Sequence, residues 1–199
     1  MESLDILLPA VAVSYLLGSI PFGLLIARAI SGVDPRLHGS GNIGATNAMR
    51  SGGKLVGVLT LMADIAKAAI PVAVALYMQA SENLLAMVGF AAFAGHCFPV
   101  WLKFKGGKGV ATMFGVMLPW MPWVAVAAFL IWFLTFKASD YVSLASVLAG
   151  LVLPLLAWLM QGSLSAIVLS ALIGLIVMIR HQGNLLRIYR GEEPKASKK

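Results

Sequence analysis

The sequence predicts an all-α integral membrane protein with seven transmembrane helices. Of its 199 residues, 60% are hydrophobic and only 12% are charged, with a mean hydropathy of +0.90. A water-soluble fold could not bury this much apolar surface. Glycine-rich or basic islands interrupt the apolar chain at residues 39–54, 103–109 and 180–193. With seven spans, every lysine and arginine except Lys67 falls on the side of the membrane that carries these three islands.

The spans follow from the length of the apolar stretches, since a helix needs about 20 residues to cross the hydrocarbon layer. They are expected at residues 4–30, 54–78, 83–102, 108–120, 121–137, 141–161 and 163–180. The stretch 108–120 is short and ends in Pro119-Trp120-Met121-Pro122, so a re-entrant segment is the alternative. Re-entry would move the basic C-terminal residues to the opposite side, and a short span is therefore favoured.

The distribution of positive charge sets the orientation. Lysine and arginine accumulate in cytoplasmic loops, which places the C-terminus inside and the N-terminus outside. Loops 31–53, 103–109 and 180–193 are then cytoplasmic, within a single polytopic domain spanning residues 1–199. The formal net charge of +7 is explained by this orientation and by anionic substrates, so we expect no nucleic-acid partner.

The first island has a composition suited to phosphate. It contains G-x-G-x-x-G between two membrane helices, whereas a dinucleotide fold needs that pattern between a strand and a helix. Glycines let backbone N–H groups face an anion, hydroxyls donate to it, and an arginine grips two oxygens at once. The candidates are Ser40, Gly41, Asn42, Thr46, Asn47 and Arg50. The alternative interpretation is an ordinary interhelical loop, because these residues also form turns.

The second island, Lys103 to Gly109, opens a helix, where free N–H groups and the helix dipole favour phosphate. It is not a nucleotide-binding P-loop, because Gly109 stands where the serine or threonine should be. Lys103 and Lys105 could simply anchor lipid headgroups, whereas Lys108 is expected to face an anion. The candidates for phosphate binding are Lys105, Gly106, Gly107 and Gly109, whereas Lys108 is a candidate catalytic residue, as are Ser40 and Arg50 of the first island.

The third island offers His181 and Asn184, which share a helix face if the last span continues. A histidine here can move protons near neutral pH or donate to a substrate oxygen, although a lone interfacial histidine is more often only solvated. Ser143 and Ser146, at the cytoplasmic start of the span 141–161, could add hydroxyl donors for phosphate.

Within the second span, Asp64 and Lys67 are three residues apart and are expected to form a structural ion pair, with a proton relay as the alternative. The single cysteine, Cys97, excludes an intrachain disulfide. Because the cytoplasmic loops contain no carboxylate cluster, we expect no metal and no cofactor. The H-x-x-x-x-D motif of common glycerolipid acyltransferases is absent.

Together these islands resemble a known family. The matching residues are Gly18 to Gly23, Asp34, Arg36, Gly39 to Asn47, Phe104 to Gly109, His181, Asn184, Arg187, Gly191 and Glu193. Over nearly its whole length the chain is similar to the bacterial acyl-phosphate glycerol-3-phosphate acyltransferases of the PlsY type. It departs from the family pattern at Pro35, Gln182, Gly183 and Leu186.

The resemblance implies transfer of a fatty acyl group from acyl phosphate to the 1-hydroxyl of glycerol 3-phosphate. This would release phosphate and lysophosphatidic acid, as the first acylation of phospholipid biosynthesis. It further implies an active site on the cytoplasmic face of the bacterial inner membrane, contact with membrane lipid, and functional coupling to the enzyme that makes acyl phosphate. The implied roles are importance for activity of Ser40 and Arg50, binding of glycerol 3-phosphate by Gly106 to Gly109, a requirement for His181 and Asn184, and a structural role for Glu193.

Two other functions stay open from the residues alone. A transporter or channel for an anionic metabolite could use the basic loops as a vestibule, although the spans contain little besides Asp64 and Lys67 to line a path. An acyltransferase could instead use acyl-CoA or acyl carrier protein as donor. Since Ser40 has no neighbouring base in the sequence, direct attack by the acceptor is favoured over a covalent acyl-enzyme.

Overall fold

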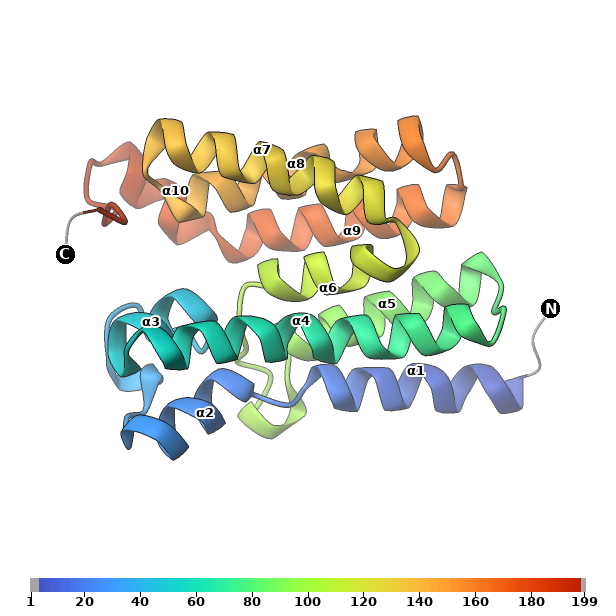
Figure 1. The fold of residues 1–199 in the computed structure, drawn as a ribbon, viewed down its shortest axis with the longest axis horizontal. Coiled ribbons are helices and arrows are strands. Elements are labelled where there is room, and N and C mark those ends of the chain that lie inside the picture. Colours follow the sequence, from blue (N-terminus) through green and yellow to red (C-terminus); the bar gives the residue numbers. More distant parts are fainter. Residues whose placement is uncertain (1–3, 198–199) are drawn as a thin grey trace. The chain divides into compact units, whose positions relative to one another are not determined.

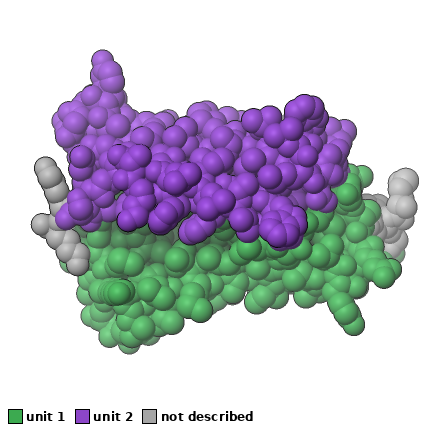
Figure 2. Space-filling model, turned by 45° about the horizontal axis from the view of Figure 1, so that its top comes forward, with its two compact units in different colours: residues 1–120 green, residues 121–199 purple. Residues whose placement is uncertain are grey.

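The computed structural model describes residues 4–197, whose regular structure is α-helical with two short 3-10 turns (Figure 1). Lys198 and Lys199, which the charge count includes, lie outside the described residues. The helices form two compact units, Met1–Trp120 and Met121–Lys199, shown in different colours in Figure 2. The sequence-based expectation of one domain does not anticipate these units.

The first unit is organised around one long helix, α4. Its helices are α1 (Leu4–Gly18), α2 (Phe22–Ser31), α3 (Ala45–Gly52), α4 (Lys54–Tyr77), α5 (Glu82–Cys97) and α6 (Val110–Trp120), with 3-10 turns at Pro35–Leu37 and Val100–Leu102. All five other helices contact α4. Ala68 and Val72 of α4 are fully buried, whereas Met62 and Ile70 are exposed, as expected for a helix with one face toward lipid.

The expected first span, residues 4–30, is not one continuous helix. It breaks between Gly18 and Phe22, because Pro21 has no N–H to continue the helical ladder. The carbonyl of Ile20 at the break accepts a hydrogen bond of 2.9 Å from Lys67 Nζ of α4. The expected loop 31–53 also differs, since it contains helix α3 and the first 3-10 turn.

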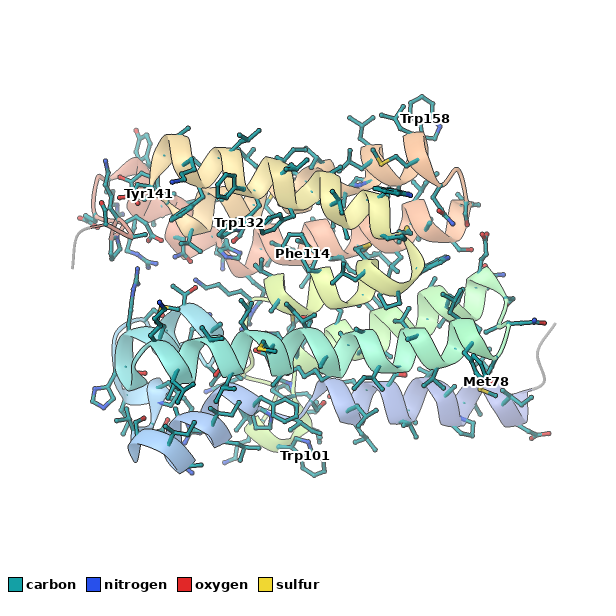
Figure 3. All side chains as sticks on the ribbon, viewed as in Figure 1. Met78, Trp101, Phe114, Trp132, Tyr141 and Trp158 are labelled. Atoms are coloured by element: carbon teal, nitrogen blue, oxygen red, sulfur yellow. The ribbon has the colours of Figure 1, made fainter. Side chains whose placement is uncertain are left out.

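The second unit is built on α8. Its helices are α7 (Pro122–Ser139), α8 (Val142–Met160), α9 (Leu164–Arg180) and α10 (Gln182–Tyr189), and α8 packs against both α7 and α9. Gly150 and Gly174 let α8 and α9 come close, because a Cβ atom on Gly174 would lie 2.3 Å from the carbonyl oxygen of Gly150. On α7, Trp132 (labelled in Figure 3) stacks with Phe129 and Phe136.

The described helices fit an integral membrane protein. Within residues 4–197, five segments are long and apolar enough to cross a bilayer: 5–31, 54–77, 82–102, 122–139 and 142–160. A sixth is obtained if α9 and α10, which meet at a bend of 54°, form one broken span. The apolar helix α6 has only 11 residues. The count of seven spans and the orientation of the termini stay predictions.

Candidate active site

Asn47 holds the first island together. Its side-chain amide is buried, and Nδ2 lies 2.7 Å from the carbonyl oxygen of Pro35, 3.1 Å from that of His38 and 2.8 Å from that of Asn42. Its Oδ1 accepts a hydrogen bond of 3.0 Å from the backbone N–H of Ser40. The amide is thus fully used inside the loop, so the expected role of Asn47 as a phosphate ligand is not supported. Asn47 is a clamp on the loop backbone.

Replacing Asn47 with alanine is expected to loosen this loop. The change removes the donor to three carbonyl oxygens, of which the one on buried Pro35 is left without this partner at a cost of about 1–3 kcal/mol. We expect faster amide hydrogen exchange at residues 35–47 in the absence of any substrate. Asn47→Asp should be as harmful as Asn47→Ala, because a carboxylate cannot donate to the three carbonyl oxygens. Exchange equal to that of the unchanged protein would contradict the clamp.

Three polar side chains of the first island remain available to a ligand. Ser40, Thr46 and Arg50 are exposed, and within residues 4–197 these side chains make no hydrogen bond or ion pair. Thr46 and Arg50 are four residues apart on α3 and therefore share a face. Asn42 instead accepts a hydrogen bond of 3.0 Å from the N–H of Gly44, which orders the start of α3. The island thus presents one guanidinium group and two hydroxyls to an anion.

Gly106 and Gly107 of the second island let the loop backbone lie directly against the end of α5. The N–H of Gly106 donates to the carbonyl of Cys97 at 3.2 Å, and the N–H of Gly107 donates to that of His96 at 3.0 Å. A Cβ atom on Gly106 would lie 2.1 Å from the His96 carbonyl oxygen. The expectation that these two glycines aim their N–H groups at phosphate is therefore wrong in this structure. The two bonds fix the loop that ends in the half-buried Lys108.

The first 3-10 turn, which carries Arg36, and the start of the second island line a cavity of about 360 Å³ in the first unit. Its lining residues are Arg36, Trp101, Leu102, Lys103 and Lys105. Trp101 is exposed and points outward from the corner after α5 (Figure 3). The candidate residue Lys105 thus shares a cationic cavity with Arg36 and Lys103. Sequence reasoning did not count Arg36 or Trp101 as site residues, since neither belongs to a glycine-rich run.

Asp34 orients the arginine of this cavity. Its carboxylate accepts hydrogen bonds from Arg36 Nη2 at 2.6 Å and from Arg28 Nη2 at 2.7 Å. The bond from Arg36 holds the pKa of Asp34 well below its usual range, and the same bond raises the pKa of Arg36. The spacing Asp34-x-Arg36 was the signal available in the sequence, because the carboxylate also accepts the backbone N–H of Arg36.

His181 sits at the bend between α9 and α10. Its Nδ1 lies 2.8 Å from the carbonyl oxygen of Val177. A carbonyl oxygen only accepts, so Nδ1 is the ring nitrogen that donates in this contact. The last span does not continue through His181 as one straight helix, because α9 and α10 meet at 54°. His181 and Asn184 are nevertheless both buried.

Glu193 gathers the other polar groups of the third island. Its carboxylate accepts hydrogen bonds from Asn184 Nδ2 at 2.6 Å, Ser143 Oγ at 2.7 Å and Arg187 Nε at 2.8 Å. Burial raises the pKa of Glu193, but the hydrogen bonds from Asn184, Ser143 and Arg187 outweigh burial and lower the pKa below its usual value. Glu193 is therefore ionised at neutral pH and joins α8 to α10 and the following turn.

The two serines of α8 differ in their availability. Ser143 donates its proton to Glu193, so it would have to exchange this partner to bind a phosphate. Ser146 is buried, donates to the Val142 carbonyl at 2.7 Å and accepts from Trp132 Nε1 at 3.2 Å. The expected phosphate-binding role of Ser146 is therefore not supported, because both its partners belong to the packing of α7 against α8.

Glu193 is expected to make stability depend on pH in acid. Since the folded-state pKa is lowered, its contribution is present above the ordinary glutamate pKa of about 4.3 and is lost as pH falls through the folded-state pKa. Glu193→Gln should lower the melting temperature at pH 7, and the gap to the unchanged protein should narrow below about pH 4. A gap that is constant between pH 7 and pH 3 would contradict this role. Thermal unfolding in detergent measures it.

Asp64 and Lys67 form the ion pair expected from their spacing. Lys67 Nζ lies 2.8 Å from Asp64 Oδ1, and both side chains are almost fully buried. The pair belongs to α4 and lies inside the first unit. The two charges neutralise each other inside the first unit, which favours the structural interpretation.

Comparison with known proteins assigns the chain to a family. The sequence profile of the family described as Glycerol-3-phosphate acyltransferase matches residues 8–191. The chain belongs to this family. The matched range contains all three islands except the last residues of the third, so Glu193 lies just beyond it.

Individual members of the glycerol-3-phosphate acyltransferase family are similar over almost the full chain. The protein from Jannaschia sp. (strain CCS1) is 47% identical over 93% of this chain and 90% of its own length. The protein from Geotalea daltonii is 46% identical over 90% of this chain and 92% of its own length. Both are named glycerol-3-phosphate acyltransferase.

Solved structures of the family member PlsY have the same fold. PlsY in its glycerol 3-phosphate form superposes with a TM-score of 0.91 at 40% identity, covering 96% of this chain and 95% of PlsY. The lysophosphatidic acid form gives 0.89 at 38% identity, with the same coverage. The PlsY-type resemblance is thus confirmed, and the chain is an integral membrane glycerol-3-phosphate acyltransferase.

Proposed function

We propose that the protein transfers a fatty acyl group from acyl phosphate to the 1-hydroxyl of sn-glycerol 3-phosphate. The products are 1-acylglycerol 3-phosphate, which is lysophosphatidic acid, and inorganic phosphate. The reaction is the first acylation of phospholipid biosynthesis. The observation that carries the proposal is the match to PlsY, whose solved forms are named for glycerol 3-phosphate and lysophosphatidic acid.

The cationic groups support an acyl phosphate donor. Both substrates then carry a phosphate, and the first unit offers the exposed Arg50, the half-buried Lys108 and the cavity with Arg36 and Lys105. An arginine binds two phosphate oxygens at once, and a lysine adds a point charge. In this proposal Arg50, Lys108 and the hydroxyls of Ser40 and Thr46 hold phosphate oxygens and oppose the charge that develops in the transition state.

The acyl transfer is proposed as a direct displacement. The acceptor hydroxyl oxygen attacks the carbonyl carbon of the acyl phosphate, the bond from that carbon to the bridging oxygen breaks, and the phosphate leaves. The proton of the hydroxyl passes to the departing phosphate, which gains negative charge as the bond breaks. His181 Nε2 and the Asn184 amide orient the attacking hydroxyl, which lowers the entropic cost of the step.

The environment of Ser40 argues against a covalent acyl-enzyme. Its backbone N–H donates to Asn47, and in the described part of the chain no base accepts a hydrogen bond from its hydroxyl. A serine nucleophile needs such a base, whereas acyl phosphate is already activated. Trapping of an acyl group on Ser40 with donor alone would overturn direct transfer.

The activity is tested by phosphate release from palmitoyl phosphate by the protein in lipid, with and without glycerol 3-phosphate. We expect release only with the acceptor, together with lysophosphatidic acid, and loss of both in His181→Ala and Arg50→Ala. Acyl-CoA is the control donor. Turnover with acyl-CoA but not with acyl phosphate would overturn the donor. Absence of turnover with both donors would favour the alternative function, a transporter for an anionic metabolite.

We also propose that the chain lies in the bacterial inner membrane, with the N-terminus outside and the islands and C-terminus in the cytoplasm. The support is the clustering of lysine and arginine in the island loops. Tyr77 and Tyr189 are both highly exposed and suit a labelling test. With Cys97→Ala, a membrane-impermeant thiol reagent should label Tyr77→Cys only in right-side-out vesicles and Tyr189→Cys only in inverted ones. The opposite pattern would reverse the orientation.

A further inference from the structure

A buried polar chain connects the broken first span to the second island. Lys67 Nζ of α4 donates to the Ile20 carbonyl at the break and pairs with Asp64 at 2.8 Å. Asp64 Oδ1 lies 3.6 Å from Nδ1 of His96 on α5. The side chains of Asp64, Lys67 and His96 are only 2–3% exposed. Three buried ionisable groups are costly to maintain, which suggests that their arrangement has a use beyond packing.

The far side of the His96 ring faces the glycine loop. A Cβ atom on Gly107 would lie 2.0 Å from His96 Nε2 and 2.6 Å from Cε1, so the ring occupies the space directly against Gly107. The His96 carbonyl also accepts the N–H of Gly107. One residue thus contacts the loop through both its ring and its backbone, immediately before Lys108.

We propose that His96 is a positioning residue, whose ring, held beside the Asp64–Lys67 pair, fixes the Gly106–Lys108 loop so that Lys108 meets the phosphate of glycerol 3-phosphate. His96 acts through the loop and does not touch the reacting atoms. The inference rests on the proposed function for the ligand of Lys108, but the position of the loop can be measured separately.

Cys97 gives a readout that needs no substrate. It is the one cysteine of the chain and is fully buried. The loop packs over it, because its carbonyl accepts the N–H of Gly106 and a Cβ atom on Gly109 would lie 3.0 Å from its Sγ. The rate at which N-ethylmaleimide modifies Cys97 therefore reports opening of the loop.

The first test is His96→Ala, with His96→Gln and Val88→Ala as comparisons. Val88 is buried on the same helix, so Val88→Ala removes apolar volume without touching the loop. His96→Ala should speed modification of Cys97 by about tenfold and raise KM for glycerol 3-phosphate by about tenfold, while KM for the acyl donor changes little. His96→Gln should change the rate of Cys97 modification and KM less than His96→Ala does, because the glutamine amide reaches the position of Nε2. Val88→Ala should change neither the rate of Cys97 modification nor KM for glycerol 3-phosphate.

The second test is a double-mutant cycle with Gly107→Ala. The added methyl group collides with ring atoms that His96→Ala removes. Gly107→Ala alone should therefore lower kcat/KM severely. In the His96→Ala background, the same substitution should change kcat/KM less than about threefold. If the losses of kcat/KM in the two single variants simply multiply in the double variant, the proposed contact between the His96 ring and the loop is overturned. If the collision makes Gly107→Ala fold poorly, the double variant lacks that collision and should fold better, so the cycle remains informative.

The outcomes separate the two proposals. If the protein does not use acyl phosphate, but Cys97 labelling follows the expected order, the donor is wrong and the positioning of the loop by His96 stands. If the protein is active and His96→Ala labels and turns over like Val88→Ala, the proposal for His96 is overturned.

Discussion

Gly106→Ala is expected to leave the protein without measurable acyltransferase activity, a loss of more than about 100-fold. The new Cβ atom would lie 2.1 Å from the His96 carbonyl oxygen, 2.4 Å from Pro99 Cδ and 2.7 Å from the Cys97 carbonyl oxygen. Two of these three atoms belong to the backbone, which cannot rotate away as a side-chain end would. The loop must therefore leave α5, and Lys108 moves with it. Steady-state turnover and the melting temperature measure the result, and both should fall.

Gly162→Ala is the matched control for this substitution. Gly162 has a positive φ of 72° in the turn between α8 and α9, and a Cβ atom there would meet nothing within 4 Å. The substitution adds backbone strain of about 1–2 kcal/mol but no collision. We expect a small drop in melting temperature with activity retained. Equal losses of activity in the two variants would show that the loss in Gly106→Ala does not come from the close approach.

Arg50→Ala is expected to lower kcat/KM by about 100-fold while leaving the melting temperature unchanged. The side chain is exposed and, within the described residues, makes no ion pair or hydrogen bond that its removal could break. Stability and activity should thus separate, in contrast to Gly106→Ala. Arg50→Lys should recover only part of the rate, because an ammonium group cannot hold two phosphate oxygens in a fixed plane.

Lys54→Ala serves as the control for loss of charge at Arg50. Lys54 begins α4 four residues later and is also exposed. If phosphate binding depends on the particular position of Arg50, Lys54→Ala should retain most of the activity at physiological ionic strength. A similar loss in both variants would mean that the island attracts anions only by its overall charge. The comparison is made on KM for glycerol 3-phosphate.

Much of the helical architecture follows from composition and breaker residues. Long apolar stretches between charged loops predict the helices near residues 54–77, 142–160 and 164–180. The pair of Asp64 with Lys67 also follows from helical spacing, because residues three apart share a face. These features depend only on residues that are close together in the sequence, so they can be predicted from the sequence alone.

Other features depend on contacts between distant residues and could not be predicted. The Pro21 signal for a break was present, but the hydrogen bond from Lys67 to Ile20 joins residues far apart in the chain. The glycines at 106 and 107 look the same in sequence whether they face an anion or a neighbouring helix end, and only the carbonyl oxygens of His96 and Cys97 decide between the two. Asn47 likewise reads as a ligand until its four loop partners are known.

The placement of Asp64 and Lys67 on one helix also bears on how the protein enters the membrane. A segment that carries a lone acid or a lone base into lipid must wait for a second segment to neutralise it. Here both charges travel within α4, and they are close enough to pair as soon as that helix has formed. This segment can therefore enter the lipid with the two charges already paired. No other helix has to bind first to neutralise a buried charge on α4.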